Sequence, residues 1–329
     1  MTRYERKLLH PPGNGEKQLY MNRPEWRWYL KYLPEDLRLT GDRLPAEEWW
    51  QCGEHSIHLD RYEQAGARAK LILVHGGGGN GRVLSAFALM AREAGMAVVA
   101  PDLPGYGLTV RRRGVRPTYR LWAEVLAQLI EAEHERDGLP VFLWGLSLGG
   151  LAAYMGAAAN DGARGVIATT LADTTRPGTM AQVAKWRWLG AVSFVGLKLV
   201  GPLLDWVQLP IRWVSRMNLI SNDPDIAAVF SRDRLAGGSL VRIGFLRSLI
   251  NVRPAKPPEE FRCPLLLAHP ALDPWTPTEL SLPFYNRIAG PKRMLELTGC
   301  GHFPVEEPGR MELEAALDRF VTDVLDGSL

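Results

Sequence analysis

A serine between glycines is the residue of this sequence whose setting best suits chemistry. Ser147 lies in the motif GLSLGG at 145–150, after the apolar run 141–144 and before an alanine-rich helical stretch over 152–159. An apolar run of this length is typical of a strand buried on both faces. A sharp turn from strand to helix would present the hydroxyl at the strand end, and the backbone N–H of Leu148 would point at a developing oxyanion. The motif predicts a nucleophile; a Gly/Ser turn without chemistry is the alternative interpretation.

Ser147 needs a base, because an unassisted serine is a poor nucleophile at neutral pH, and the base needs an orienting group. His302 follows the last predicted strand in GCGHFP, and Asp273 follows the preceding strand in HPALDPW. The chain order Ser, Asp, His and the position of each residue at a strand end predict a triad of Ser147, His302 and Asp273. Asp173 is the competing acid. Without catalysis, His302 would be a structural loop histidine and Asp273 a turn or cap residue.

A run of glycines at 76–79 follows the predicted strand 70–75. Such a loop can cradle phosphate, but the lysine of a P-loop and the G-x-G-x-x-G spacing are both missing. An oxyanion loop is the better interpretation, because glycines allow backbone N–H groups to approach a substrate carbonyl. Gly77 together with Leu148 is the predicted pair of donors, with Gly78 as the second choice. Other polar residues are expected to stabilise loops: His75, Asp102 and His269.

The rest of the chain alternates strands with helices. Buried strands are predicted at 70–75, 96–100, 141–144, 165–170, 264–268 and 293–297, and helices at about 83–94, 119–136 and 311–325. Alternating hydrophobicity between 49 and 62 predicts antiparallel strands at a sheet edge. This order predicts an α/β protein with a doubly wound, mostly parallel sheet and right-handed crossovers. Ligands bind at the carboxyl ends of the strands in such sheets, where the triad candidates lie.

Three regions of the chain differ in pattern. Residues 1–48 are polar, punctuated by prolines and rich in aromatics, and predict an N-terminal extension that packs on the main domain. The α/β core is expected over 49–173 and 259–329. Residues 174–258 interrupt its rhythm between two strands and predict a helical cap, or lid, over the catalytic face.

Four tryptophans mark the predicted cap: Trp186, Trp188, Trp206 and Trp213. One interpretation is an ordinary core between lid helices. The other is an apolar acyl pocket or an interfacial surface, because basic residues such as Lys185, Arg212 and Arg216 lie among them. Either interpretation favours an apolar acyl substrate over a sugar or a nucleotide, and the second adds a transient contact with a membrane or lipid surface.

Several motifs occur in a fixed order: HGGGGN at 75–80, DLPGYG at 102–107, GLSLGG at 145–150, an Asp after the penultimate strand and GHFP at 301–304. Over residues 69–170 and 263–325 this set resembles the α/β-hydrolase superfamily. The segment 221–251 resembles the lid of its monoacylglycerol lipase and lysophospholipase-like group. The resemblance implies the α/β-hydrolase fold and a serine hydrolase that acts on carboxylic esters, with Ser147, His302 and Asp273 as its triad.

Composition narrows the function classes. The 39 basic and 36 acidic residues nearly balance, at a net charge of +3, so no nucleic-acid partner is expected. Three cysteines, Cys52, Cys263 and Cys300, indicate a reduced compartment without a disulfide framework, and the N-terminus lacks an apolar stretch of signal-peptide length. We therefore expect a cytoplasmic protein with a small-molecule substrate and neither metal nor cofactor. No pattern predicts an oligomeric state.

Other functions are compatible with the same triad. An aminopeptidase of the proline-cleaving kind would need carboxylates for the substrate amine, and no pattern ties the acidic residues of the cap to the catalytic mouth. A hydrolase of carbon–carbon bonds in diketones is a further alternative. A noncatalytic ligand-binding relative usually lacks a triad member, whereas all three candidates are present here. Relatives with an aspartate nucleophile cleave epoxides or carbon–halogen bonds, which Ser147 disfavours.

Overall fold

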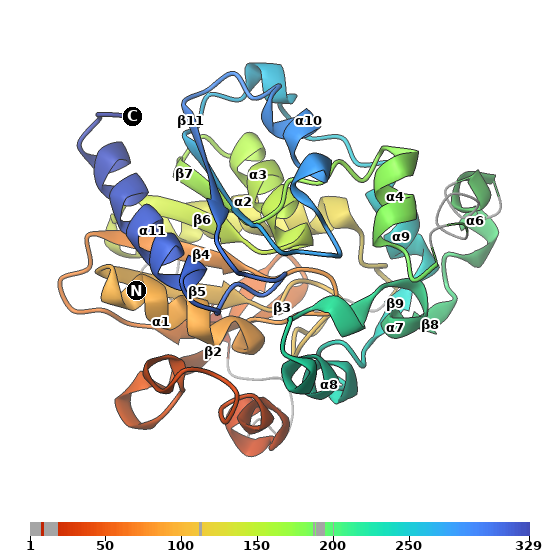
Figure 1. Ribbon diagram of the computed structural model, residues 1–329, viewed down its shortest axis with the longest axis horizontal. Coiled ribbons are helices and arrows are strands. Elements are labelled where there is room, and N and C mark those ends of the chain that lie inside the picture. Colours follow the sequence, from red (N-terminus) through yellow and green to blue (C-terminus); the bar gives the residue numbers. More distant parts are fainter. Residues whose placement is uncertain (1–7, 10–18, 112–113, 187, 189–194, 200) are drawn as a thin grey trace.

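The computed structural model describes residues 8–9, 19–111, 114–186, 188, 195–199 and 201–329, and within them the chain forms a nine-stranded central sheet (Figure 1). The parallel strands lie in the order β5 (Met96–Pro101), β4 (Ala69–Val74), β6 (Val141–Gly145), β7 (Ala163–Ala168), β10 (Leu265–Pro270) and β11 (Lys292–Leu297). Beyond β5 the sheet continues with the antiparallel strands β3 (His55–Tyr62), β2 (Ala46–Cys52) and β1 (Leu8–Leu9). The mostly parallel sheet with an antiparallel edge, predicted from the sequence, is confirmed.

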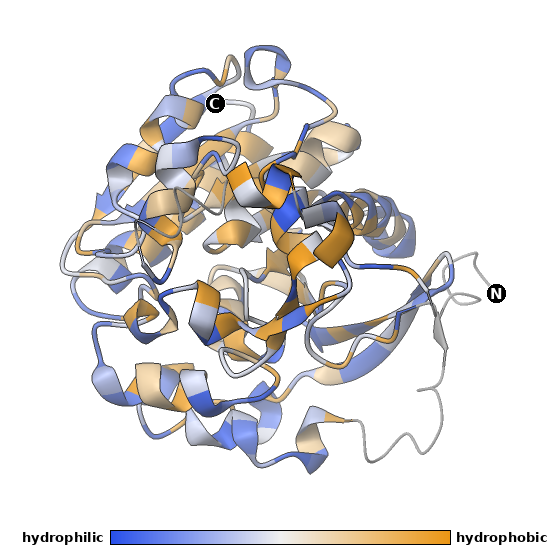
Figure 2. Cartoon of the chain, turned by 90° about the vertical axis from the view of Figure 1, so that its right-hand side faces the viewer, coloured by the Kyte–Doolittle hydropathy of each residue, from blue (hydrophilic) through white to orange (hydrophobic). Residues whose placement is uncertain are grey.

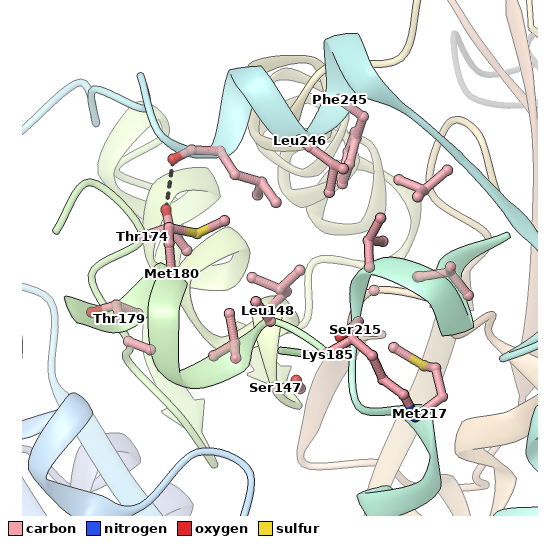
Figure 3. A pocket seen from close by; sticks show the side chains of 18 of the residues that line it. Ser147, Leu148, Thr174, Thr179, Met180, Lys185, Ser215, Met217, Phe245 and Leu246 are labelled. Atoms are coloured by element: carbon pink, nitrogen blue, oxygen red, sulfur yellow. Dashed lines mark hydrogen bonds between the residues drawn. The ribbon is translucent and has the colours of Figure 1, made fainter. Parts of the chain in front are cut away.

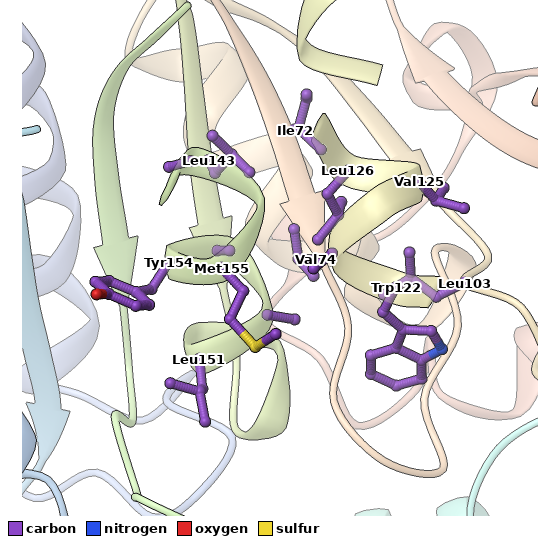
Figure 4. Close-up of a cluster of buried hydrophobic side chains, with 14 of the residues drawn as sticks. Ile72, Val74, Leu103, Trp122, Val125, Leu126, Leu143, Leu151, Tyr154 and Met155 are labelled. Carbon is purple, nitrogen blue, oxygen red and sulfur yellow. The ribbon is translucent and has the colours of Figure 1, made fainter. Parts of the chain in front are cut away.

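Helices cover both faces of this sheet (Figure 1). They are α1 (Ser85–Glu93), α2 (Tyr119–Asp137), α3 (Leu148–Ala159) and α11 (Gly309–Leu325). Ile72 and Val74 of β4 are buried in one cluster with residues of α2 and α3 (Figure 4). Leu71 and Leu73 of the same strand are buried in a second cluster, with residues of α1 and α11. Successive side chains of β4 therefore enter opposite layers, which is why the strand is an unbroken apolar run in the sequence.

Local signals set the bounds of these helices. The hydroxyl of Thr118 accepts a hydrogen bond from the N–H of Leu121 at 3.1 Å and so caps the start of α2, while Gly138, with a φ of 74°, ends it. The observed bounds of α1, α2 and α11 lie within two residues of the predicted ones.

The described part of the N-terminal extension, residues 19–44, packs on the core. It consists largely of short 3₁₀ helices at Tyr20–Asn22, Glu25–Trp28, Glu35–Leu37 and Gly41–Arg43. Trp26, Leu33 and Leu37 are buried in the cluster that contains residues of α1 and α11. The extension therefore completes the layer on one face of the sheet.

Residues 174–258, which lie between β7 and β10 in the sequence, are called the inserted segment below. Its elements are α4 (Pro177–Val183), α6 (Gly201–Leu204), β8 (Gln208–Pro210), α7 (Ile211–Val214), α8 (Pro224–Arg232), β9 (Leu240–Arg242) and α9 (Ile243–Leu249). They lie to one side of the sheet, at the right of Figure 1. β8 and β9 pair as an antiparallel two-stranded sheet. The sequence predicted a helical segment, and the structure adds these two strands to its helices.

Seen from the side of the inserted segment, apolar residues gather toward the middle of the molecule and hydrophilic residues along the outer helices (Figure 2). A last short helix, α10 (Leu282–Tyr285), lies between β10 and β11 in the sequence. In the described part of the chain, no helix combines the length and apolar character that a membrane crossing requires.

Candidate active site

Ser147 occupies a strained turn between β6 and α3. Its φ of 55° is the only positive φ among the described residues other than glycine. The backbone N–H of Ser147 donates a hydrogen bond to the hydroxyl oxygen of Thr169 at 3.1 Å. A Cβ at Gly145 would lie 2.0 Å from the carbonyl oxygen of Gly149, and one at Gly149 would lie 2.2 Å from that of Val74. The two glycines of the motif are therefore required by close backbone contacts, and the turn predicted around the serine is present.

His302 and Asp273 form a buried pair. His302 Nδ1 lies 2.7 Å from Asp273 Oδ2, and both residues are at most 5% exposed. The Thr276 hydroxyl donates to the same carboxylate oxygen at 2.6 Å, and the N–H groups of Trp275 and Thr276 donate to the other one at 2.8 and 3.0 Å. Burial alone would raise the pKa of Asp273, but His302 and these donors hold it well below its usual value. The ionised carboxylate keeps the proton of a neutral imidazole on Nδ1 and leaves Nε2 as the acceptor.

The second nitrogen of this histidine is unused in the structure. His302 Nε2 is buried and has no hydrogen-bond partner among the described residues, so Ser147 does not donate to it here. Ser147, Trp275 and Thr276 nevertheless line one cavity. Hydrogen bonds between catalytic groups are often long without substrate and tighten when it binds. The strand ends thus bring the serine to a cavity whose wall includes two residues that contact the His–Asp pair, Trp275 and Thr276, without a hydrogen bond between Ser147 and His302.

Asp173, the competing acid of the sequence, is used elsewhere. Its Oδ1 accepts hydrogen bonds from the N–H and the hydroxyl of Thr175, at 3.0 and 2.6 Å. The carboxylate therefore stabilises the turn that follows β7. The structure pairs Asp273, and not Asp173, with His302.

Three further polar residues hold loops, as the sequence suggests. His75 Nδ1 lies 2.8 Å from the carbonyl oxygen of Gly76, and its Nε2 accepts from the N–H of Leu103 at 2.9 Å. Burial lowers the pKa of His75, which favours the neutral ring that both contacts need. Asp102 accepts from backbone N–H groups on both sides, and His269 contacts the carbonyl oxygen of Pro270.

The glycine loop lies against the turn that carries the serine. Gly77 lines the cavity together with Ser147 and Leu148, and a Cβ at Gly77 would lie 3.0 Å from Leu148 Cδ1. Gly78 is not among the described residues that line the cavity. The structure thus brings Gly77 and Leu148 together and leaves Gly78 outside the cavity.

The cavity has a volume of about 300 Å³ (Figure 3). One wall comes from the ends of the parallel strands, and the other comes from α4, α7 and α9 of the inserted segment. Apolar side chains from that segment dominate it: Met180, Val183, Ile211, Val214, Val241, Phe245, Leu246 and Leu249. Among the described lining residues, Lys185 is the only one with a charged side chain. The cavity therefore suits an apolar chain.

Of the four tryptophans predicted to form the pocket, the structure places only Trp213 at the cavity. Trp186, Trp188 and Trp206 are not among its lining residues and are 51–69% exposed. Many of the apolar residues that do line it lie in helices of four to seven residues, α4, α7 and α9, which are too short to show a helical period in the sequence. Sequence reasoning therefore missed Met180, Ile211 and Phe245.

Glu47, His58 and Asp60 form a group whose spacing could hold a metal ion, with their ligand atoms within 4.8 Å of one another. The Arg82 guanidinium already lies among them. Its Nε is 2.5 Å from Asp60 Oδ2, and its Nη2 is 3.1 Å from Glu47 Oε1. A cation of the protein therefore neutralises these carboxylates. None of the three cysteines forms a disulfide bond among the described residues, and burial raises the pKa of Cys263 and of Cys300 to about 12, which makes both thiols poor nucleophiles.

The sheet order, the strained serine turn and the His–Asp pair after the last strands define the α/β-hydrolase fold. The chain belongs to the alpha/beta hydrolase family, whose model matches residues 71–314. A comparison with curated protein sequences finds no match.

Solved structures with the same fold include lipases and esterases. The monoacylglycerol lipase of Paleococcus ferrophilus is 24% identical, with a TM-score of 0.66 over 81% of this chain and 98% of that one. A soluble variant of monoglyceride lipase from Saccharomyces cerevisiae, in complex with a substrate analog, is 15% identical, with a TM-score of 0.69 over 88% and 96%. A carboxyl esterase from Bacillus coagulans is 20% identical, with a TM-score of 0.62 over 85% and 98%. At these identities the likeness establishes a shared fold.

Proposed function

We propose that this protein is a serine hydrolase that cleaves carboxylic esters of apolar acids. The observation that carries the proposal is the position of Ser147, on a strained strand-to-helix turn that faces the apolar cavity whose wall includes Trp275 and Thr276 beside the His302–Asp273 pair. Family membership supports hydrolase chemistry, and the lipases and esterases of the same fold make an ester the first substrate to test.

The proposed reaction has two steps through an acyl-enzyme. Ser147 Oγ attacks the ester carbonyl while His302 Nε2 takes its proton, and Asp273 stabilises the imidazolium that results. The N–H groups of Gly77 and Leu148 hold the oxyanion of the tetrahedral intermediate. The alcohol leaves with the proton from His302. Water then attacks the acyl-enzyme by the same route, which releases the acid and restores Ser147.

The lining of the cavity favours this substrate class over the alternatives. An aminopeptidase would hold the substrate amine with carboxylates, and no Asp or Glu is among the described residues that line the cavity. A carbon–carbon bond hydrolase could use the same three residues, so the leaving group has to be tested directly. A noncatalytic ligand-binding relative has no need of the strained serine or of the His–Asp pair.

The inserted segment, 174–258, is proposed as the cap of a core formed by 49–173 and 259–329, with 1–48 as a separate extension. Several large apolar side chains on the outer side of this cap are 66–76% exposed: Trp188, Leu199, Leu203 and Trp206. Exposed apolar side chains close to basic ones are typical of proteins that touch lipid surfaces. We therefore include a transient contact of the cap with a lipid surface in the proposal.

A fluorophosphonate probe, followed by mass spectrometry of the adduct, tests the nucleophile, and a p-nitrophenyl ester series of increasing chain length tests the substrate. We expect labelling at Ser147 and an optimum at an apolar chain. Ser147→Ala should lose both while its thermal unfolding stays close to that of the wild type. Ester turnover by Ser147→Ala, or labelling of another residue in the wild type, would refute the assignment.

A further inference from the structure

Lys185 places a positive charge at the solvent-exposed edge of the cavity that Ser147 also lines. It is the only charged side chain among the described residues that line the apolar cavity, and in Figure 3 it extends away from Ser147, toward Met217. In the described part of the chain no carboxylate pairs with it. Among the described residues, its ammonium group makes one hydrogen bond, from Nζ to Asn218 Oδ1, which is 3.5 Å long and solvent-exposed. An ammonium group at this position has charge to offer to a ligand.

Backbone contacts connect the segment that carries Lys185 to Val214, Ser215 and Trp275. The N–H of Lys185 donates to the carbonyl oxygen of Val214 at 3.0 Å, next to the bridge between Ala184 and Ser215. The carbonyl oxygen of Val183, two residues earlier, accepts from Trp275 Nε1 at 3.1 Å. Because the Trp275 ring lies against His302, the backbone two residues before Lys185 is tied to the His–Asp pair.

A second cation belongs to the same piece of structure. Arg216 follows the bridged residue Ser215, and its Nη1 lies 3.5 Å from the carbonyl oxygen of Pro274, beside Asp273. The acyl-binding part of the cavity lies elsewhere: in Figure 3, Thr174, Met180 and Leu246 surround its other end. The two cations therefore stand where the alcohol side of an ester would emerge.

We propose that the substrate carries an anionic group, a phosphate or a carboxylate, on its leaving alcohol, and that Lys185 binds this group with Arg216 beside it. The inference rests on the proposed function and adds the substrate class. A charge-assisted hydrogen bond is stronger than one between neutral groups. An ester with a neutral alcohol would leave the ammonium with only its long contact to Asn218.

The test compares three decanoyl esters below their critical micelle concentrations: decanoylglycerol, decanoylglycerol 3-phosphate and the decanoyl ester of glyceric acid. The wild type should have a kcat/KM about tenfold higher for an anionic ester than for the neutral one at low salt, as expected for one charge-assisted contact. The phosphate and carboxylate arms identify which anion the site prefers. The ratio should fall as ionic strength rises, because salt screens an exposed cation.

Substitution of the cation isolates its role. Lys185→Met should lower the ratio of anionic to neutral kcat/KM about tenfold, and Lys185→Glu should bring it below one. Lys31→Met, on the exposed surface of the extension, is the matched control and should keep the wild-type ratio. A wild-type ratio of one or less for both anions, or an unchanged ratio in Lys185→Met, overturns the inference.

A binding measurement covers the case in which the phosphate ester is a poor substrate. In the wild type, decyl phosphate should inhibit p-nitrophenyl ester hydrolysis about tenfold more strongly than decanol. In Lys185→Met, the two compounds should inhibit equally. Equal inhibition by both compounds in the wild type overturns the inference alone. Failure of Ser147 to react with the fluorophosphonate probe, with no ester hydrolysed, instead overturns the proposed function.

Discussion

The indole ring of Trp275 lies against the imidazole ring of His302, with centroids 4.6 Å apart and planes inclined by 39°. The same indole donates its Nε1–H to the carbonyl oxygen of Val183, at the end of α4, at 3.1 Å. One side chain therefore joins the candidate base to the inserted segment. Any movement of that segment acts on His302 through Trp275.

Trp275→Phe separates the two contacts of the indole, because it keeps a ring against His302 and removes the hydrogen bond to Val183. We expect KM to rise several-fold while kcat stays within about threefold of the wild type. Trp275→Ala, which also removes the ring, should lower kcat by roughly ten- to a hundredfold, since small displacements of a catalytic group are costly. Steady-state kinetics on a p-nitrophenyl ester separate the two effects. An unchanged kcat in Trp275→Ala would show that the ring does not position His302.

Asp273→Asn tests the acid of the triad. The amide keeps the size of the side chain but no longer favours the proton on Nδ1 of His302, so we expect kcat to fall by about 10³ to 10⁴. The pKa of Asp273 lies well below its usual value, so protonation of this carboxylate does not limit the rate of the wild type near neutral pH. Asp173→Asn is the control, because the Asp173 carboxylate accepts hydrogen bonds from Thr175 of its own turn and not from His302. Loss of activity in Asp173→Asn instead would reverse the two assignments.

Features that depend on residues close together in the sequence could be predicted, and contacts between distant residues could not. The glycines around Ser147 and the strand before it lie within ten residues, so the turn was predictable, and the pairing of His302 with Asp273 followed from strand ends that adjoin in a parallel sheet. Contacts across the fold had no such signal. The bridge between Ala184 and Ser215, next to the cavity residue Lys185, joins two short irregular pieces of the inserted segment.

The tryptophans show the same limit. Size and hydrophobicity made Trp186 and Trp206 candidates for the pocket, but burial is decided by which side of a short element faces the core, and both are more than half exposed. The sequence predicted that the extension packs on the core but not through which residues, since the hydroxyl of Tyr20 reaches the carboxylate of Asp102 across 82 positions of the sequence.

Gly76→Ala tests how closely the glycine loop packs on the nucleophile. The new Cβ would lie 2.9 Å from Ser147 Cβ and 3.0 Å from the carbonyl oxygen of Leu146, so either the loop or the turn has to shift. We expect kcat to fall by roughly ten- to a hundredfold. Gly178→Ala is the matched control, because nothing lies within 4 Å of its added Cβ. Full activity in Gly76→Ala, with both variants folded by circular dichroism, would contradict the predicted fit.

His58 lies at the centre of a buried network of charges on the face that the extension covers. Its Nε2 is 3.0 Å from Glu47 Oε2, and its Nδ1 is 3.2 Å from Asp102 Oδ2. Asp102 also accepts from the hydroxyl of Tyr20, at 2.9 Å, and from the N–H of Gly81, at 2.7 Å, directly after the glycine loop. The network therefore links the extension to the backbone that precedes α1.

The protonation of His58 predicts how stability depends on pH. Burial opposes the charge, but the carboxylates of Asp102 and Glu47 raise its pKa to about 9, above the value of about 6.5 expected in the unfolded chain. The folded state thus binds the proton more tightly, and its stabilisation is complete below pH 6.5 and lost as the pH rises through 9. The loss should be about 3 kcal/mol in the free energy of unfolding. Urea unfolding at intervals between pH 6 and 10 measures this loss of free energy of unfolding.

Two histidine variants identify the group that titrates. His58→Gln should flatten the decline with pH, whereas His134→Gln, on the exposed end of α2, should keep it. Equal slopes for the wild type and His58→Gln would show that His58 is not the group that titrates.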